Sequence, residues 1–527
     1  MSRSRTRPPR TDALAVPTAI GAAIPLRWAV AWPHAVAAAT TGALIGATFL
    51  NFHLHLFAWI AFAPLLWALS RARDRRETII IAAIAGMVTN VIGFYWLIYT
   101  IRVFGGFPYA IAVLVFAVLA AASSLQFVLF GLAFTRTGWG PLALAPAMLW
   151  TSIEFLYPNL FPWRMAHTQN LVVPLIQIGD LTGPFGLSLV VVWASAAVAQ
   201  LVTTSRRRIA SLATVGVVIA SVYVYGLARI ASVETTMRAV PPVSIALVQG
   251  NVGIKEKKSQ AYFEINVERY RQLTASLQDR VALAIWPETV VQEWLPTETT
   301  SLADSDLPFP GLTTQLIYGG LAYHRTGPRE ADEYNSAFLI DRSGALLNRY
   351  DKQILMPFGE YIPFASLFPA IKRLSPQTGG FTPGRETHTF TVPNVGQIGP
   401  LICFEDLVTA IPRAMTQAGA EVLVAMANDA WYGESAAPYD HQAIALWRAI
   451  ENRRYLLRVN NSGVTSVIDP LGRVVGELPI FTADALVASV HPLKIMSVFT
   501  RIGHVFGWGL VGATVLLVMR ARRPVAG

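Results

Sequence analysis

Three segments of this sequence each contain a reactive or charged side chain, and in two of them it follows an apolar run. Glu288 ends the segment IWPE (285–288), Lys352 follows Tyr350 and Asp351, and Cys403 ends the segment GPLIC (399–403). A carboxylate can take the proton of a thiol, and the thiolate is then a nucleophile. A lysine ammonium favours both a thiolate and an oxyanion. The three residue types therefore suit acyl transfer through a thioester.

Each of these three signals is weak by itself. Cys403 is the only cysteine, so no intramolecular disulfide can form. A lone cysteine is more often a small buried hydrophobic residue than a nucleophile. Glu288 could equally be a surface turn residue, and Lys352 could be a lysine that extends along the surface to water. Their combination, and the position of two of them after apolar runs, favours the catalytic interpretation.

Further polar and aromatic residues surround the three segments. Glu360 lies among prolines and apolar side chains, where a carboxylate needs a partner or a task. The backbone N–H of Phe404 is a candidate second oxyanion donor, and Glu405 follows it. Candidate substrate-binding aromatics are Phe358, Trp431 and Tyr432, and Phe364 and Phe368 could line the same pocket, with ordinary packing as the alternative interpretation. Tyr361 is a further supporting candidate.

The region that carries these residues alternates strand and helix patterns. The predicted helices cover 261–277 and 441–451. The predicted strands cover 242–250, 281–286, 316–323, 336–341, 397–403, 421–426, 455–460 and 464–468. Such alternation predicts an α/β layered domain in which helices cover a sheet. Proline ends a strand ladder, so Glu288 is expected at a carboxyl end, where ligands of α/β sheets collect.

The rest of the chain has the composition of a membrane protein. Hydrophobic residues make up 53% and charged residues only 14%, against about 25% charged in soluble domains. Runs of about 17–25 apolar residues can span a bilayer. We predict eight such helices, at 32–50, 53–70, 77–100, 108–134, 140–157, 185–204, 209–229 and 503–519.

The net charge of +10 is concentrated beside these apolar runs. With the N-terminus in the cytoplasm, all four basic clusters lie on the cytoplasmic side, as the positive-inside rule requires. This placement argues against a nucleic-acid partner. The clusters are Arg3, Arg5, Arg7 and Arg10; Arg71, Arg73, Arg75 and Arg76; Arg206, Arg207 and Arg208; and Arg520, Arg522 and Arg523.

These observations divide the chain into four parts. We predict a basic cytoplasmic arm with an apolar lead-in (1–31), seven membrane helices (32–232), an extracytoplasmic catalytic domain (233–497), and a last membrane helix with a basic tail (498–527). The loop 158–184 contains Pro158, Phe161, Pro162 and Trp163 and is expected on the outer side. It is typical of a membrane anchor, although it could also line an entrance for lipid chains.

Together, the three segments resemble the nitrilase superfamily, which uses a Glu-Lys-Cys triad on an αββα sandwich. Lys352 follows Glu288 by 64 positions, and Cys403 follows Lys352 by 51. The whole chain most closely resembles the membrane-embedded branch formed by the apolipoprotein N-acyltransferase family. The supporting motifs are LVQGN (247–251), WPE (286–288), residues 350–363, ICFE (402–405), NDAWYG (428–433), NNSGVT (460–465) and FPW (161–163).

This resemblance implies a general base at Glu288, a transition-state stabiliser at Lys352 and a nucleophile at Cys403. It implies acidic supporting positions at Glu360 and Glu405. It further implies a phospholipid acyl donor, a diacylated apolipoprotein acceptor, no cofactor, and a multi-pass protein of the bacterial inner membrane with a periplasmic catalytic domain. One departure concerns the donor lipid: some relatives carry a tryptophan where this chain has Lys258.

Two other functions fit parts of the sequence. A membrane-tethered amidase would need the triad but not eight helices. A transporter or receptor with an inactive sandwich would explain the helices, but it leaves the triad as a coincidence, and no intramembrane acidic relay is visible. We expect no metal site, because His441 is isolated and no Cys/His ligand spacing occurs.

Overall fold

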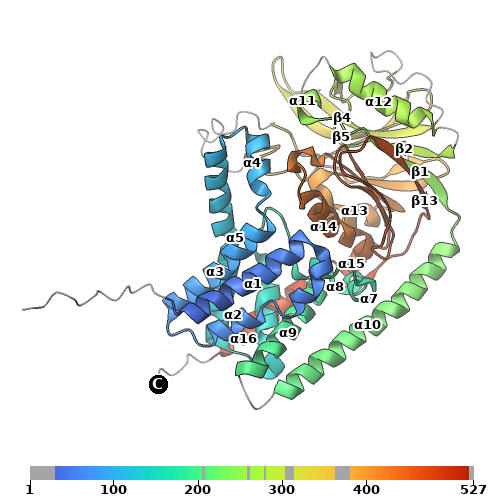
Figure 1. Cartoon of the computed structure of the whole chain (residues 1–527). Helices are drawn as coiled ribbons and strands as arrows, with labels where there is room; N and C mark the ends of the chain where they lie inside the picture. Colours follow the sequence, from blue (N-terminus) through green and yellow to red (C-terminus); the bar gives the residue numbers. More distant parts are fainter. Residues whose placement is uncertain are drawn as a thin grey trace, which may run out of the picture.

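A computed structural model of the chain describes residues 30–203, 208–257, 262–277, 280–302, 314–362 and 380–521. Apolar helices form one end of the molecule, and a β-sandwich forms the other (Figure 1). The fold class predicted from the sequence is confirmed: several apolar helices precede a nitrilase-like α/β domain with mixed sheets. The basic clusters at 3–10, 206–207 and 522–523, and Lys258, lie outside the described residues.

All eight predicted apolar runs contain helix. Six helical segments within the described part of the chain are long and apolar enough to cross a bilayer, and two shorter apolar helices accompany them. The main helices are α1 (Trp32–Leu50), η1 (Phe52–Trp59) with α2 (Ala63–Leu69), α3 (Arg75–Gly93), α5 (Tyr109–Thr137), η2 (Pro141–Ala143) with α6 (Leu144–Leu156), α9 (Pro184–Thr203), α10 (Arg208–Arg238) and α16 (Val505–Arg520).

One helix prediction is wrong in its extent. The run 77–100 was expected to form a single helix, but α3 ends at Gly93 and a separate helix, α4 (Leu97–Gly105), follows. Glycine is a weak helix former, and the chain then turns so that the rings of Phe94 and Trp96 are buried. Both rings pack on Phe161, at centroid distances of 6.3 and 5.3 Å. Tertiary packing therefore divides into two helices a segment that hydrophobicity alone predicts as one.

The segment 158–184 is more than a membrane anchor. It contains the short helices η3 (Met165–Gln169), α7 (Val173–Ile176) and α8 (Gly179–Thr182), and residues 165–170 are buried. The Asn170 amide donates to the carbonyl of Ala443 at 2.9 Å and accepts from the Trp447 indole N–H at 2.9 Å. This segment therefore joins the membrane helices to the sandwich.

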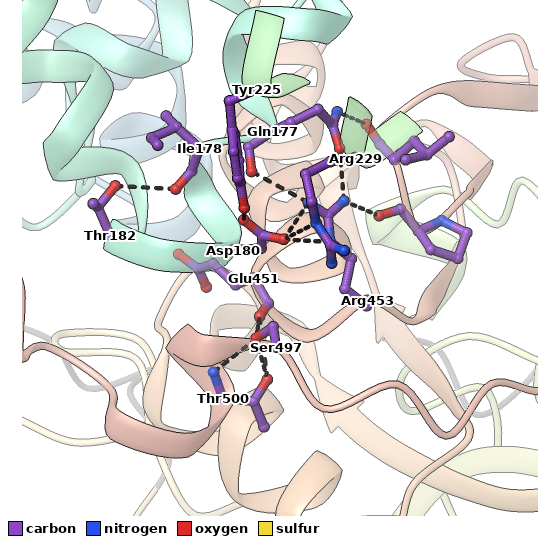
Figure 2. Close-up of polar contacts among 12 residues, drawn as sticks. Gln177, Ile178, Asp180, Thr182, Tyr225, Arg229, Glu451, Arg453, Ser497 and Thr500 are labelled. Carbon is purple, nitrogen blue, oxygen red and sulfur yellow. Dashed lines mark hydrogen bonds and ion pairs between the residues drawn. The ribbon is translucent and has the colours of Figure 1, made fainter. Parts of the chain in front are cut away.

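A buried ion-pair cluster strengthens this junction (Figure 2). The Asp180 carboxylate of α8 accepts from the Tyr225 hydroxyl at 2.6 Å and the Arg229 Nε at 2.8 Å, both on α10. It also lies 2.8 Å from Nη2 of Arg453, which precedes the strand β10. The Gln177 side chain accepts from Nη1 of Arg453 at 2.6 Å. Three elements that are distant in sequence thus share one carboxylate.

The sandwich consists of two sheets. A seven-stranded sheet has the order β13-β1-β2-β4-β5-β6, with β3 paired to β4, and a six-stranded sheet has the order β12-β11-β10-β9-β8-β7. The first sheet contains β1 (Val243–Gln249), β2 (Leu283–Ile285), β3 (Trp294–Pro296), β4 (Gln315–Arg325), β5 (Ala331–Ile340), β6 (Leu346–Asp351) and β13 (Asp484–Val490). The second contains β7 (Phe390–Val392), β8 (Gly396–Ile402), β9 (Val422–Ala427), β10 (Tyr455–Asn460), β11 (Thr465–Ile468) and β12 (Val474–Leu478).

Side-chain alternation along the strands builds the layers, because successive residues of a strand face opposite sides of the sheet. In β1, Ala246 and Val248 belong to the cluster beneath α12 (Phe263–Ala275), whereas Ile245 and Leu247 belong to the main core. The helices α13 (Ala410–Gln417) and α14 (Ala437–Asn452) accompany the second sheet, on the side of the membrane helices (Figure 1). The main core continues without interruption into the apolar helices.

Candidate active site

Strand topology brings the predicted glutamate and lysine to the same sheet edge. β2 runs parallel to β4, and β6 is antiparallel to β5, which is itself antiparallel to β4. β2 and β6 therefore point the same way. Glu288 follows the carboxyl end of β2, and Lys352 directly follows that of β6. Carboxyl ends of parallel strands are where α/β sheets collect their ligands.

The turn that carries Glu288 requires a very close approach to the next strand. The backbone N–H of Gly319 in β4 donates to the carbonyl of Pro287 at 3.1 Å. A Cβ atom at Gly319 would lie 2.6 Å from the Cα of Glu288, so no larger residue fits there without displacing the turn. Thr289 adopts the left-handed region, with φ of 46°. The turn is thus held in one conformation by packing.

Lys352 is the centre of the charged cluster. Its side chain is 1% exposed, and its ammonium lies 2.8 Å from Glu360 Oε2, 2.9 Å from Glu360 Oε1 and 3.5 Å from Glu288 Oε1. The buried amide of Asn335 donates from Nδ2 to Glu288 at 2.8 Å and to Glu360 at 3.0 Å. The partner that the sequence required for Glu360 is therefore Lys352, and Asn335 joins the two carboxylates.

Cys403 begins the 3₁₀ turn η7 (Cys403–Asp406) directly after β8. It is half-buried and has a φ of 50°, a conformation that costs a non-glycine residue about 1–3 kcal/mol and concentrates at functional sites. Burial raises the pKa of the Cys403 thiol well above its usual value, and the Glu288 charge raises it further, while Lys352 opposes both. The sulfur is thus a thiol at neutral pH, with a carboxylate and an ammonium group in its electrostatic environment.

The ammonium group stays charged in this environment. Burial alone would lower the pKa of Lys352, but the carboxylates of Glu360 and Glu288 outweigh it and hold that pKa above its usual value. A fixed cation beside a thiol stabilises the thiolate, and it also stabilises an oxyanion that forms on an attacked carbonyl.

Glu405 connects the lysine segment to the cysteine segment. Its Oε1 accepts from the Tyr350 hydroxyl at 2.9 Å and from the backbone N–H groups of Gln353 and Ile354 at 2.7 and 3.1 Å. Its Oε2 accepts from the backbone N–H of Ile402 at 2.8 Å. Burial raises the pKa of Glu405 to about 7, against these hydrogen bonds. One buried carboxyl thus joins the end of β6 to the start of the turn η7.

The description of His441 as isolated is wrong. It is fully buried on α14, where Nε2 lies 2.7 Å from Asp406 Oδ1 and Nδ1 lies 3.0 Å from Asp429 Oδ1. Arg458 Nε donates to the other oxygen of Asp406 at 3.0 Å. Burial alone would lower the pKa of His441, but the two carboxylates raise it to about 9. The imidazolium therefore links the turn η7 to the turn η8 (Asp429–Tyr432).

The predicted pocket aromatics have different environments. Phe358 and Tyr361 are 52% and 40% exposed and flank Glu360 in a tight turn, in which Phe358 N–H donates to the Tyr361 carbonyl at 2.7 Å. Phe404 and Trp431 are half-buried. Tyr432 is buried and packs edge-on against Trp96 of the membrane part at 5.4 Å. Two further aromatics that the sequence suggested, Phe364 and Phe368, lie outside the described residues.

Sequence reasoning missed the groups that hold the charged residues in place. Asn335 sits inside β5, where asparagine is unfavourable, and that mismatch is the one local signal for it. Tyr350 was noted only as a neighbour of Lys352. Within the described ranges, no group of three or more His, Cys, Asp and Glu side chains is arranged to hold a metal ion.

Comparison with known proteins identifies relatives over nearly the whole chain. Residues 41–197 match the apolipoprotein N-acyltransferase N-terminal domain, and residues 244–497 match the carbon-nitrogen hydrolase family. An apolipoprotein N-acyltransferase of Geobacter metallireducens is 31% identical over 501 residues, covering 92% of this chain and 95% of the relative. One of Rhodopseudomonas palustris is 30% identical over 541 residues, covering 96% and 98%. Among solved structures, Saccharomyces cerevisiae Nit3, of the nitrilase superfamily, superposes with a TM-score of 0.38 at 17% identity, covering 50% of this chain and 96% of that one.

Proposed function

Because the chain belongs to the apolipoprotein N-acyltransferase family, we propose that it transfers a fatty acyl group from a phospholipid, through a thioester on Cys403, to the N-terminal amine of a diacylglyceryl-cysteine in apolipoproteins. One observation supports the residue assignment above all others. The Lys352 ammonium lies 3.5 Å from Glu288 Oε1 at one sheet edge, and the Glu405 carboxylate joins the residue after Lys352 to the residue before Cys403, the only cysteine of the chain.

In the first half-reaction the lipid ester is broken. Glu288 takes the proton of the Cys403 thiol, and the sulfur attacks the ester carbonyl carbon to form a C–S bond. Lys352 and the backbone N–H of Phe404 stabilise the oxyanion. When it collapses, the C–O bond to glycerol breaks and Glu288 returns the proton to the leaving oxygen. Lysophospholipid leaves, and the acyl group remains on sulfur.

In the second half-reaction the α-amine of the acceptor attacks the thioester carbonyl. The C–N bond forms and the C–S bond breaks, while Glu288 takes a proton from the amine and returns it to the sulfur. The products are an amide and the free thiol, so no external oxidant, reductant or nucleotide is needed.

An apolar cavity supports a lipid substrate. It has a volume of about 160 Å³ and is lined by Phe94, Leu97, Phe116, Phe161 and Trp163, among others, at the ends of α3, α4 and α6. Trp96 packs between Phe161 and Tyr432, so aromatic contacts continue from this cavity to the turn η8. Each CH₂ contributes about 0.8 kcal/mol to membrane retention, so an acyl chain reacts most readily at a site that opens to the bilayer.

We assign the sandwich to the periplasmic side of the inner membrane. Eight spans with a cytoplasmic N-terminus place every basic cluster in the cytoplasm, Arg71–Arg76 and Arg520 included. Lys494 is exposed on the sandwich. In spheroplasts of cells that carry Cys403→Ala and Lys494→Cys, a membrane-impermeant maleimide is expected to label the protein. Labelling only after lysis would contradict the assignment.

Intact-protein mass spectrometry tests the chemistry directly. After incubation of the full-length enzyme with dipalmitoyl phosphatidylethanolamine, we expect a mass increase of one palmitoyl group, which hydroxylamine removes and a diacylated lipopeptide amine discharges. Cys403→Ala should show neither adduct nor transfer. An enzyme that hydrolyses amides without lipid and never forms the adduct would instead be an amidase.

A further inference from the structure

A second cavity, of about 180 Å³, lies where the nucleophile segment meets the membrane helices. Phe155 at the end of α6, Phe185 at the start of α9 and His504 just before α16 form its membrane side. Leu407 and Thr409, which follow the turn η7, belong to its sandwich side. The cavity therefore lies at the helix ends that adjoin the catalytic domain.

The charged residues that line this cavity are all cationic. Arg164 and Arg448 line it, and none of its described lining residues is a carboxylate. Arg448, on α14, is 2% exposed. Its Nη2 donates to Glu451 at 2.9 Å, but Nε and Nη1 have no hydrogen-bond partner among the described residues. A buried guanidinium with two unused donors is costly, and an anion in the cavity would remove that cost.

His167 supplies a further donor. Its Nδ1 accepts a hydrogen bond from the backbone N–H of Arg164 at 3.1 Å, so the proton of the neutral ring lies on Nε2. Burial lowers the pKa of His167 well below its usual value, and the charges of Arg164 and Arg448 lower it further, so the ring is neutral. The residue is 1% exposed, and Nε2 has no partner among the described side chains and backbone groups.

The two guanidinium groups act on each other unfavourably. Burial lowers the pKa of Arg164, and the charge of Arg448 lowers it further. Glu154 attracts Arg164 and Glu451 is paired with Arg448, but neither carboxylate lines the cavity. Arg164 is partly engaged: Nη1 donates to the Trp163 carbonyl at 2.9 Å and the group lies over the Phe185 ring. Its other nitrogens remain for a ligand.

We propose that this cavity binds the phosphate of a phospholipid headgroup, with Arg164, Arg448 and the Nε2 of His167 as donors. Guanidinium groups bind phosphate through paired, charge-assisted hydrogen bonds, and basic pockets between membrane helices bind lipid headgroups. The volume equals that of roughly six water molecules, which is enough for a phosphate group. The proposal rests on the proposed function, in which a phospholipid is the acyl donor.

The position relative to the nucleophile fits a donor lipid. Leu407 lines the cavity four residues after Cys403, so at most about 14 Å of chain separates them. A glycerophospholipid carries its ester carbonyls and its phosphate on one glycerol unit. A phosphate held in this cavity would therefore place the glycerol unit beside the chain segment that carries Cys403, while the acyl chains stay among the membrane helices.

Native mass spectrometry of the full-length protein in detergent tests the site without turnover. In a Cys403→Ala background, we titrate dipalmitoyl phosphatidylethanolamine and, separately, dipalmitoylglycerol, which lacks the phosphate. Adding Arg164→Gln is expected to raise the Kd of the phospholipid about tenfold, a loss of ~1.4 kcal/mol, and to leave dipalmitoylglycerol binding unchanged. Arg164→Lys, which keeps the charge, is expected to recover part of the affinity.

Arg501→Gln is the matched control, because Arg501 is exposed three residues before His504 and does not line the cavity. It should change neither Kd. Equal phospholipid affinity in the Arg164→Gln and Arg501→Gln proteins would overturn the proposal. The proposal would also be overturned if the cavity bound free phosphate. In that case inorganic phosphate would stabilise the protein that keeps Arg164 but not the Arg164→Gln variant, and both proteins would bind phospholipid with equal affinity. The proposed function fails separately, if wild-type Cys403 forms no acyl adduct.

Discussion

Glu360 binds the Lys352 ammonium with both carboxylate oxygens, at 2.9 Å from Oε1 and 2.8 Å from Oε2. Glu288 lies farther from the same ammonium, at 3.5 Å. The proposed mechanism gives the two carboxylates different roles. In it, Glu360 neutralises and orients the lysine, whereas Glu288 is the base that takes the proton of Cys403. Asn335 donates to both carboxylates and so joins them.

The first prediction concerns Glu360→Gln. The substitution keeps the shape of the side chain but leaves the buried ammonium with one carboxylate, and Glu288 would then pair with Lys352 instead of serving Cys403. We expect the rate of acyl-enzyme formation to fall by about 10²–10³, the loss typical for a disturbed oxyanion site. Intact-mass kinetics with phosphatidylethanolamine measure it.

Glu386→Gln serves as the control for that measurement. Glu386 is exposed in the same part of the sandwich, so its replacement should leave the rate within about twofold, as surface substitutions usually do. Equal rates for the two variants would show that Glu360 does not orient the lysine.

The sequence was sufficient to predict residues whose position follows from strand direction. Glu288 and Cys403 each follow an apolar strand that the sequence predicts, and the carboxyl ends of parallel strands converge. The strand before Lys352, β6, was not among the predicted strands. The sequence was insufficient to predict the roles of Asn335 and His441. The partners of Asn335 lie 25 and 47 residues away along the chain, and those of His441 lie 12 and 35 residues away. These groups meet only when the sheets and helices pack. The break between α3 and α4 could not be predicted from the sequence either, because it depends on contacts between Trp96 and the distant rings of Phe161 and Tyr432.

A second prediction compares the substitution of Glu405 with that of Tyr350, whose hydroxyl donates to it. Glu405→Gln replaces one acceptor oxygen by an N–H donor, which must face a backbone N–H at Ile402 or at Gln353 and Ile354. We expect at least about a tenfold loss of acyl-enzyme formation and a lower unfolding temperature, because a buried donor is left unsatisfied. Tyr350→Phe removes a single hydrogen bond and should lower the free energy of unfolding by only about 1 kcal/mol. A larger decrease in unfolding temperature for Tyr350→Phe than for Glu405→Gln would contradict this prediction.

A third prediction concerns the junction between the membrane helices and the sandwich. Asp180→Asn removes the charge that faces buried Arg453 and half-buried Arg229 (Figure 2). Breaking a buried pair in this way costs about 3–5 kcal/mol. Lys494→Gln removes the exposed partner of half-buried Glu421 and should lower the free energy of unfolding by less than about 1 kcal/mol. Thermal unfolding in detergent, followed by circular dichroism, compares the two. Similar unfolding temperatures would show that the cluster does not stabilise the junction.

A fourth prediction uses the raised pKa of His441. Because its folded pKa of about 9 exceeds the ordinary 6.5, its contribution to stability is full below about pH 6.5 and is lost as the pH rises through 9. The wild-type unfolding temperature should fall over this window. His441→Asn, which cannot become charged, should be less stable at about pH 6 and should show a flatter profile across the same window. Parallel profiles for both proteins would refute the ion-pair assignment.

The last prediction concerns the thiol itself, which the absence of other cysteines makes easy to follow. Burial and the negative charge of Glu288 both raise the pKa of Cys403, and Lys352 lowers it. Glu288→Gln removes one of the raising causes, so the pH midpoint of Cys403 alkylation by iodoacetamide should fall even though acyl transfer is lost. Lys352→Met removes the opposing cation and should raise that midpoint. Both substitutions are expected to abolish turnover, but they should shift the alkylation midpoint in opposite directions if the effect is electrostatic. After a general loss of structure, both midpoints would instead move toward that of an ordinary exposed cysteine.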